Sequence, residues 1–272
     1  MSQILLCWVT CLTVAYPPTD RPAGGAPNRS ATLSSGQRRA AVQDLVDIRS
    51  FRDRKSDRFL VDLQTVRTGH PYKGKRAQRP HTGGHIYFRL PRAPLPASQP
   101  ARFPPIYAVA DGVITRVDYS FRLREIFVSA LQRRVSNTRY GIGLAFASSS
   151  GRPVEMHYSI EPFIDPGDAM FYDRFILVKV GQRVSKGDLI ARMYLPPDPR
   201  VARNAHIHFN LLGGASRTFQ SPSIFSKRIV RRFHATWDER RGTDRGVPIP
   251  PCMGYQLAPV ENPFEFRSAD AL

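Results

Sequence analysis

Short apolar runs separated by turn residues fill the middle of the chain. Between residues 81 and 212 these runs are rich in Val, Ile, Tyr and Phe, and glycine, proline or serine bounds most of them. Runs of this kind are typical of β-strands. The predicted strands lie in the segments 86–88, 106–117, 140–147, 154–159, 178–193 and 206–212. We therefore expect a mainly β fold, with a compact antiparallel β-sheet or barrel-like core and peripheral helices.

Glycines divide this region into separate strands. Asp111-Gly112, inside the 106–117 run, is a strong hairpin signal and predicts two short strands joined at that point. Gly181 and Gly187 predict turns between the strands of 178–193. The segment 121–135 mixes arginine with apolar residues and is compatible with an inserted helix.

Outside this region the pattern changes toward helices and polar linkers. Apolar residues at helical spacing predict a short helix at 39–48 and a terminal helix at 224–239, and 59–63 predicts another strand. Residues 4–15 resemble the apolar core of a secretory signal. The predicted organisation is a signal segment at 1–15, a disordered linker at 16–38, an N-terminal extension at 39–77, the main domain at 78–215, and a C-terminal helix and tail at 216–272.

The charge balance restricts the class of partner. Forty Lys and Arg against 22 Asp and Glu give a net charge of +18, which favours anionic partners such as nucleic acid, an acidic cell-wall polymer or membrane headgroups. No nucleic-acid-binding module surrounds the Arg-rich segment 227–241, so we expect no specific nucleic-acid partner. No apolar run is long enough for a transmembrane span, and the three cysteines form neither a disulfide framework nor a cysteine-type zinc site.

Histidines gather in the predicted strands. His206 and His208 are two residues apart in an extended run, so both imidazoles project from one face of the strand. His81 and His85 are four residues apart, but two glycines between them favour a loop entering a strand over a helix. His157 lies within another predicted strand. Imidazole binds metals and titrates near neutral pH, yet it is also an ordinary structural side chain, so both interpretations stay open at this point.

The order of five sequence blocks resembles one family of enzymes. The blocks are His81-x-Gly83, the stretch from Ala108 to Ile114 around Asp111-Gly112, Met156-His157-x-Ser159, Val178-x-x-Gly181-Gln182-x-Val184-x-x-Gly187, and His206-x-His208-Phe209. This order resembles the lysostaphin/LytM-like zinc metallopeptidases, peptidase family M23, over roughly residues 78–215. The resemblance implies an endopeptidase that cuts peptide bonds in the peptidoglycan of bacterial cell walls, with Zn²⁺ as its cofactor.

The resemblance also assigns roles to individual histidines. It places zinc on His81, on position 85 and on His208, and it makes His157 and His206 the catalytic histidines. Zinc would polarise the scissile carbonyl and activate a water molecule. His206 would then take the proton of that water, and His157 would donate to the developing oxyanion.

Position 85 departs from the family pattern, which has a metal-binding aspartate there. His85 keeps a ligand that zinc accepts, and three histidines with an open water position form a known catalytic arrangement. The exchange removes one negative charge from the site. Two functions follow as expectations: an extracytoplasmic zinc endopeptidase acting on peptidoglycan or a similar peptide, or a degenerate domain that binds cell wall or a partner enzyme without cutting.

Overall fold

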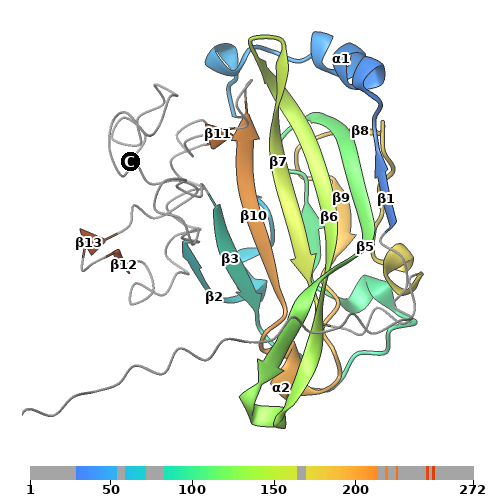
Figure 1. The fold of residues 1–272 in the computed structure, drawn as a ribbon, viewed down its shortest axis with the longest axis vertical. Helices are drawn as coiled ribbons and strands as arrows, with labels where there is room; N and C mark the ends of the chain where they lie inside the picture. Colours follow the sequence, from blue (N-terminus) through green and yellow to red (C-terminus); the bar gives the residue numbers. More distant parts are fainter. Residues whose placement is uncertain are drawn as a thin grey trace, which may run out of the picture.

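One large antiparallel β-sheet organises the chain, and a small two-stranded sheet lies behind it (Figure 1). The computed structural model describes residues 29–53, 59–71, 83–163, 170–213, 218–219, 225, 243–244 and 247–248. The strands are β1 (Arg29–Thr32), β2 (Val66–Pro71), β3 (Gly83–Phe88), β4 (Pro105–Tyr107), β5 (Gly112–Val128), β6 (Arg133–Ser149), β7 (Arg152–Glu161), β8 (Arg183–Val184), β9 (Leu189–Arg192), β10 (His206–Gly213), β11 (Thr218–Phe219), β12 (Thr243–Asp244) and β13 (Val247–Pro248). The α-helices are α1 (Ser35–Gln43) and α2 (Pro199–Ala202), and single 3₁₀ turns lie at Ile48–Ser50, Leu63–Thr65, Pro100–Arg102, Ser129–Leu131 and Phe171–Arg174.

The strand order of the large sheet is β1-β5-β6-β7-β10-β3-β2, with β8 also paired to β5 and β11 to β10. The strand pairs of this sheet are antiparallel. Strands that are distant in sequence become neighbours, since β10 pairs with β3 on one side and with β7 on the other. The prediction of a mainly β protein with an antiparallel sheet is confirmed. The core is a sheet rather than a closed barrel, since the described part of the sheet stays open between its edge strands β1 and β2.

Alternation along the strands gives the large sheet one apolar and one polar face. On β10, Ile207, Phe209 and Leu211 are fully buried, and they belong to one continuous core with residues of β4 and β9. His206 and His208 alternate with these residues, so they lie on the opposite face. Tyr158 of β7 ties the two layers together, because its hydroxyl donates to the carbonyl of Tyr107 and accepts from the amide of Val109.

The Asp111-Gly112 pair is not a hairpin turn, so that prediction was wrong. It joins two sheets instead: β4 pairs with β9, whereas β5 pairs with β6. Glycine is required here by a close backbone approach, since a Cβ atom at Gly112 would lie 2.2 Å from the carbonyl oxygen of Ala145. A close approach and a tight turn both select glycine, and the local sequence does not distinguish them.

The segment 121–135 forms strand rather than the inserted helix with which its pattern was compatible. Strands β5 and β6 continue past the body of the sheet into a long hairpin that protrudes at the bottom of Figure 1. Its sequence alternates at the start, with Phe121 and Leu123 separated by Arg122, which is the period of a strand. The pairing of β5 with β6 starts in the body of the sheet, at Val113 opposite Ala145. It continues through several register shifts to Val128 in the hairpin.

Part of the predicted disordered linker is ordered, which corrects the prediction for residues 29–38. Residues 29–32 form β1, which pairs with β5 at the sheet edge, and α1 begins at Ser35. A capping box starts the helix: the amide of Gln37 donates to Ser34 Oγ at 3.2 Å, and the amide of Ser34 donates to Gln37 Oε1 at 3.1 Å. Ser34 and Gln37 fall in the segment predicted as a polar linker, and no helix start was predicted there.

The remaining local predictions had mixed outcomes. The predicted helix at 39–48 is realised as α1, which ends earlier, at Gln43. The predicted strand at 59–63 is only an isolated bridge between Val61 and Ile106. The glycine turns are confirmed, with φ of 86° at Gly181 and 88° at Gly187. All but one residue of the predicted helix at 224–239, and the whole segment 1–28, lie outside the described residues, and the domain limits stay a prediction.

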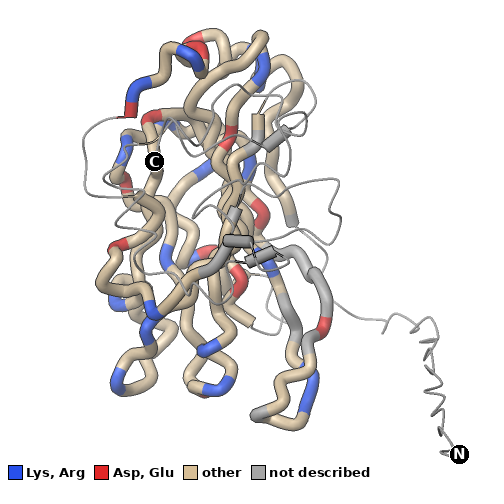
Figure 2. The backbone as a smooth tube through the Cα atoms, turned by 90° about the vertical axis from the view of Figure 1, so that its left-hand side faces the viewer, with Lys and Arg blue, Asp and Glu red and all other residues tan. Residues whose placement is uncertain are grey.

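No helix within the described ranges has the length and apolarity needed to cross a bilayer. Basic positions occur along the whole height of the molecule, from α1 to the β5–β6 hairpin, with fewer acidic positions between them (Figure 2).

Candidate functional site

Four of the five predicted site histidines lie on the polar face of three adjacent strands. His85 of β3 stands directly opposite His208 of β10, and His206 follows on the same face of β10. On the other side of β10, His157 of β7 pairs with Asn210, which places it diagonally from His208. Diagonal neighbours in an antiparallel pair are about 7–8 Å apart, within reach of side chains of this length. The fifth histidine, His81, lies outside the described residues.

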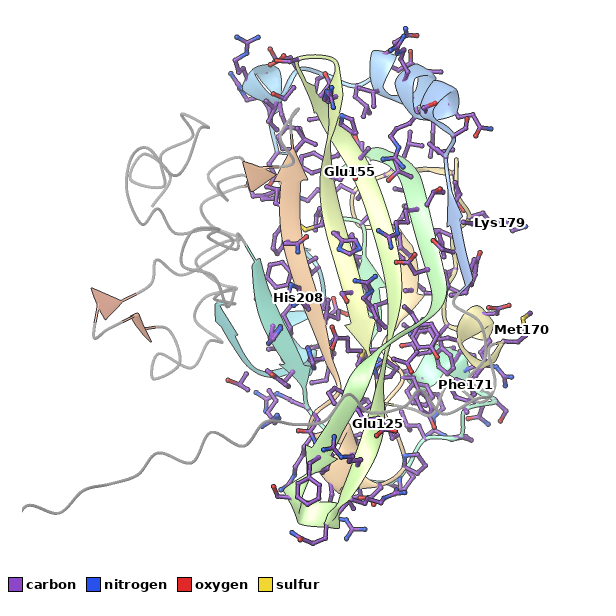
Figure 3. The ribbon with its side chains drawn as sticks, in the orientation of Figure 1. Glu125, Glu155, Met170, Phe171, Lys179 and His208 are labelled. Carbon is purple, nitrogen blue, oxygen red and sulfur yellow. The ribbon has the colours of Figure 1, made fainter. Side chains whose placement is uncertain are left out.

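His85 and His208 approach each other through their ring nitrogens. Nε2 of His85 lies 3.0 Å from Nδ1 of His208, and Figure 3 shows His208 near the middle of β10. Two imidazole nitrogens that face each other at this distance share either a proton or a cation. Nitrogens bound to one tetrahedral zinc are about 3.3 Å apart, given Zn–N bonds of about 2.0–2.1 Å. The pair therefore fits two ligands of one zinc ion.

A complete metal site does not follow from the described part of the chain alone. Among those residues, no group of three or more His, Cys, Asp or Glu side chains has the arrangement of a metal site. His81 is absent from that part, so the geometry of the predicted ligand set beyond His85 and His208 stays a prediction.

His206 is held by two groups that the sequence reasoning missed. Its Nδ1 lies 2.7 Å from the carbonyl oxygen of Asn204, which can only accept, so Nδ1 carries a proton. Its Nε2 faces Oε2 of Glu161 at 3.4 Å, and the hydroxyl of Ser159 donates to the other oxygen of Glu161 at 3.2 Å. Glu161 therefore places a carboxylate beside Nε2, the ring nitrogen that carries no proton in the neutral imidazole when Nδ1 donates to Asn204.

Glu161 could have been found from the sequence. It lies four residues after His157 on the same strand, so the alternation of an extended strand puts His157, Ser159 and Glu161 on one face. Aromatic rings complete the surroundings of His206, with the centroids of Tyr87 and Phe163 at 5.2 and 5.7 Å from the imidazole. Nothing local in the sequence places Phe163 there.

His157 occupies a more enclosed and more positive environment. Its Nε2 is buried and has no hydrogen-bond partner within the described residues. The pKa of His157 is lowered to about 4, first by burial and then by the guanidinium groups of Arg139 and Arg116, while Asp118 opposes the shift. His157 is therefore neutral at neutral pH, and a neutral imidazole is suited to donating one N–H hydrogen bond rather than a free proton.

Two glycines of β6 bring these charges close to His157. A Cβ atom at Gly141 would lie 2.5 Å from Oδ2 of Asp118, and one at Gly143 would lie 2.9 Å from Oγ1 of Thr115 and 3.3 Å from Cβ of Arg116. Side chains of β5 therefore lie over bare backbone of β6, toward β7. The Gly-Ile-Gly sequence of β6 makes room for an ionic network on the polar face.

The network is centred on a fully buried carboxylate. Asp118 accepts from Ser30 Oγ at 2.7 Å and from Arg116 Nε at 2.9 Å. Arg116 Nη2 lies 2.8 Å from Oδ2 of Asp118, and Arg139 Nη2 lies 3.5 Å from the same oxygen. Sequence reasoning missed this network, because its members come from three strands that become neighbours only in the sheet.

The lowered pKa of His157 predicts a pH-dependent contribution to stability. The unfolded chain has the ordinary histidine pKa of about 6.5, so as the pH falls from about 6.5 to 4 the unfolded state binds a proton that the native state refuses. We expect His157 to cost up to roughly 3 kcal/mol of unfolding free energy across this window. Above pH 6.5 this loss is absent.

Urea unfolding at several pH values, for the wild type and for His157→Gln, measures this contribution. The difference in unfolding free energy between the two proteins should change between pH 6.5 and 4 in favour of the variant. A constant difference across that window would contradict the prediction.

Few known proteins are similar to this chain. No protein-family model matches the chain, and no curated protein matches it. Two solved structures match: the catalytic domain of the antimicrobial peptidase lysostaphin from Staphylococcus simulans, and a solution structure of lysostaphin. The first is 18% identical with a TM-score of 0.28, covering 59% of this chain and 91% of that one. The second is 13% identical with a TM-score of 0.28, covering 81% of this chain and 63% of that one. Values this low do not by themselves establish a shared fold.

Proposed function

We propose that the protein is a zinc-dependent endopeptidase. The observation that carries the proposal is the approach of His85 Nε2 to His208 Nδ1 at 3.0 Å, beside His206, whose Nε2 is placed to accept a proton. The His85–His208 pair could bind a metal, and His206 beside it, next to the Glu161 carboxylate, could act as a base. Hydrolysis of a peptide bond needs both of these functions. The ordered sequence blocks that resemble M23 peptidases support the same proposal independently of the geometry.

Three histidines would hold the metal: His81, His85 and His208. His81 precedes His85 by four residues, and that length of extended chain spans at most about 13–14 Å, so it can return to the same site. Nitrogen ligands suit zinc, and the fourth position stays open for water or substrate. Bound zinc would supply Lewis acidity toward the scissile carbonyl and lower the pKa of a water molecule.

His206 acts as the general base in this proposal. The Asn204 carbonyl fixes its tautomer, so Nε2 is the atom that receives the proton of the attacking water. Glu161 then stabilises the imidazolium, because its Oε2 lies 3.4 Å from that nitrogen. The proton is afterwards available for the leaving amine.

His157 acts as a hydrogen-bond donor to the negative charge that develops on the substrate oxygen. Its pKa of about 4 keeps it neutral, so it donates without losing its proton at neutral pH. The guanidinium groups of Arg116 and Arg139 add positive potential on the same side of the site.

The substrate we propose is a peptide of bacterial peptidoglycan, cleaved outside the cytoplasm. The net charge of +18 favours an anionic matrix such as a cell wall, and the apolar segment at residues 4–15 suits an exported chain. The alternative is a domain that binds cell wall or a partner enzyme without cutting. Its specific support is His85, which stands where the family has an aspartate.

Metal content of the purified protein tests the proposal. We expect one zinc per chain in the wild type and loss of zinc in His81→Ala, His85→Ala and His208→Ala, since each removes one of three ligands. His85→Asp should keep the zinc, because it restores an oxygen ligand at that position. His234→Ala, which removes a histidine outside the five sequence blocks, is the matched control and should keep the zinc as well. A natively folded wild type without zinc would overturn the proposal.

A further inference from the structure

A groove opens on the polar face between α1 and the strands β5 to β7. Its volume is about 750 Å³, which is in the range of ligand-binding clefts. His157 lines it, and Glu155 lies further along β7 toward α1, as labelled in Figure 3. Because His157 also stands diagonally from His208, the groove leads directly away from the candidate catalytic site. The charged and titratable side chains that line it are those of Arg38, Arg39, Arg116, Arg152, Glu155 and His157.

Three of the four arginines that line this groove are unpaired within the described residues. Among the described residues, the side chains of Arg38, Arg39 and Arg152 make no hydrogen bond or ion pair, whereas Arg116 is bound to Asp118. Arginine is usually paired where a carboxylate is within reach, and elsewhere in this protein Arg183 pairs with Asp44 in that way. The groove therefore presents guanidinium groups whose donors are available to a ligand.

Glu155, the one acid among the described residues that line the groove, restricts the class of ligand. Glu155 has a buried Oε1 without a hydrogen-bond partner among the described residues. A carboxylate in this position repels a polyanion such as nucleic acid, and it accepts from an amide or amine. Three unpaired guanidinium groups beside one carboxylate suit a ligand that carries both a carboxylate and N–H donors, which is the chemistry of a peptide.

We propose that this groove binds a carboxylate-bearing part of the peptide substrate, held by Arg38, Arg39 and Arg152. The inference rests on the proposed peptidase function for the identity of the ligand. Arginine binds a carboxylate through two parallel hydrogen bonds, which fixes the direction of the peptide as well as its charge. Since the groove begins at His157, a peptide anchored there extends past that residue toward His206 and His208.

Binding of labelled peptides to the full chain tests this assignment. Three fluorescent probes of equal length are compared by anisotropy in the His206→Ala background, which prevents cleavage: an internal Glu with an amidated end, an internal Gln with a free end, and an internal Gln with an amidated end. The first probe carries its carboxylate on a side chain, the second carries it at the C-terminus, and the third has no carboxylate. We expect one of the first two to bind roughly three- to tenfold more tightly than the third.

Arginine variants assign that preference to the groove. Arg38→Gln, Arg39→Gln and Arg152→Gln should each reduce the preference about three- to tenfold, and Arg39→Lys should retain part of it because it keeps the charge. Arg134→Gln removes the same charge from the far end of the β5–β6 hairpin and should leave the preference unchanged. Equal binding of the three probes, or an equal effect of Arg134→Gln, would overturn the inference. Tighter binding of duplex DNA through the same arginines would overturn it too.

The same titration separates this inference from the proposed catalysis. Carboxylate binding in the groove needs no zinc, so the preference should persist in His208→Ala even though that variant is expected to lose zinc. A carboxylate preference in a wild-type protein that holds no zinc supports the groove and counts against the peptidase. Zinc and cleavage without any carboxylate preference count against the groove alone. Thermal unfolding of each variant verifies that the comparison concerns folded protein.

Discussion

Replacing His206 with alanine is expected to lower the rate of peptide cleavage about 10²–10⁴-fold while one zinc per chain is retained. The physical reason is that the two histidines of β10 have different proposed roles, His208 as a metal ligand and His206 as the general base. His208 faces His85 at 3.0 Å, whereas His206 is held by Asn204 and Glu161 and is the proposed acceptor of the proton of the attacking water. Cleavage of a crosslinked peptidoglycan peptide, measured together with zinc content, checks both parts.

Two variants act as controls for this result. His208→Ala should lose zinc and activity together, because it removes a ligand. Glu161→Gln keeps the size of the side chain but removes the charge that stabilises the imidazolium, so it should give a smaller loss of activity with zinc unchanged. If His206→Ala loses its zinc, then His206 is a ligand and the assignment is wrong. Activity that survives in His206→Ala would contradict the general-base role directly.

Replacing Asp118 with alanine is expected to lower the free energy of unfolding by about 3–5 kcal/mol. Asp118 is fully buried, accepts hydrogen bonds from Ser30 and Arg116, and forms an ion pair with Arg139. Its removal leaves Arg139, whose side chain is 18% exposed, without the carboxylate that compensates its buried charge. Urea unfolding at neutral pH measures the loss, and an unchanged slope of free energy against urea shows that the same transition is compared.

Asp44→Ala is the matched control for the ionic network. Asp44 also pairs with an arginine, Arg183, but both side chains are more than 60% exposed. Water screens such a pair, so the variant should stay within about 1 kcal/mol of the wild type. Losses of equal size in Asp44→Ala and Asp118→Ala would show that burial does not set the value of the Asp118 network.

The strands that carry the candidate site were predictable because each has a clear local signal. Alternation and β-branched residues marked 206–212 and 154–159 as strands, and the same alternation put His206 and His208 on one face. The start of α1 was predictable too, since Ser34 and Gln37 form a capping box, but the polar composition around them favoured a linker. The Pro, Gly, Ser and Arg content of residues 16–38 therefore favoured a linker more strongly than the Ser34–Gln37 pair favoured a helix start.

Other features had no local signal that distinguished them. Gly112 satisfies a close approach to Ala145, and the same Asp-Gly pair would mark a hairpin turn in another context. Glu161 was recoverable from the alternation of β7, but its partner His206 is 45 positions away in sequence, and only the pairing of β7 with β10 brings them together. Asp118 and Arg139 meet for the same reason.

The sequence by itself determined which residues form strands and which face of each strand its histidines share, because these depend on the period of a single extended segment. Only the tertiary structure decided that β10 lies between β3 and β7, which sets His208 against His85 and His157 diagonally from His208. Strand order and register arise from burying the apolar faces of many strands at once. They therefore depend on contacts between distant segments, and no single stretch of the chain encodes them.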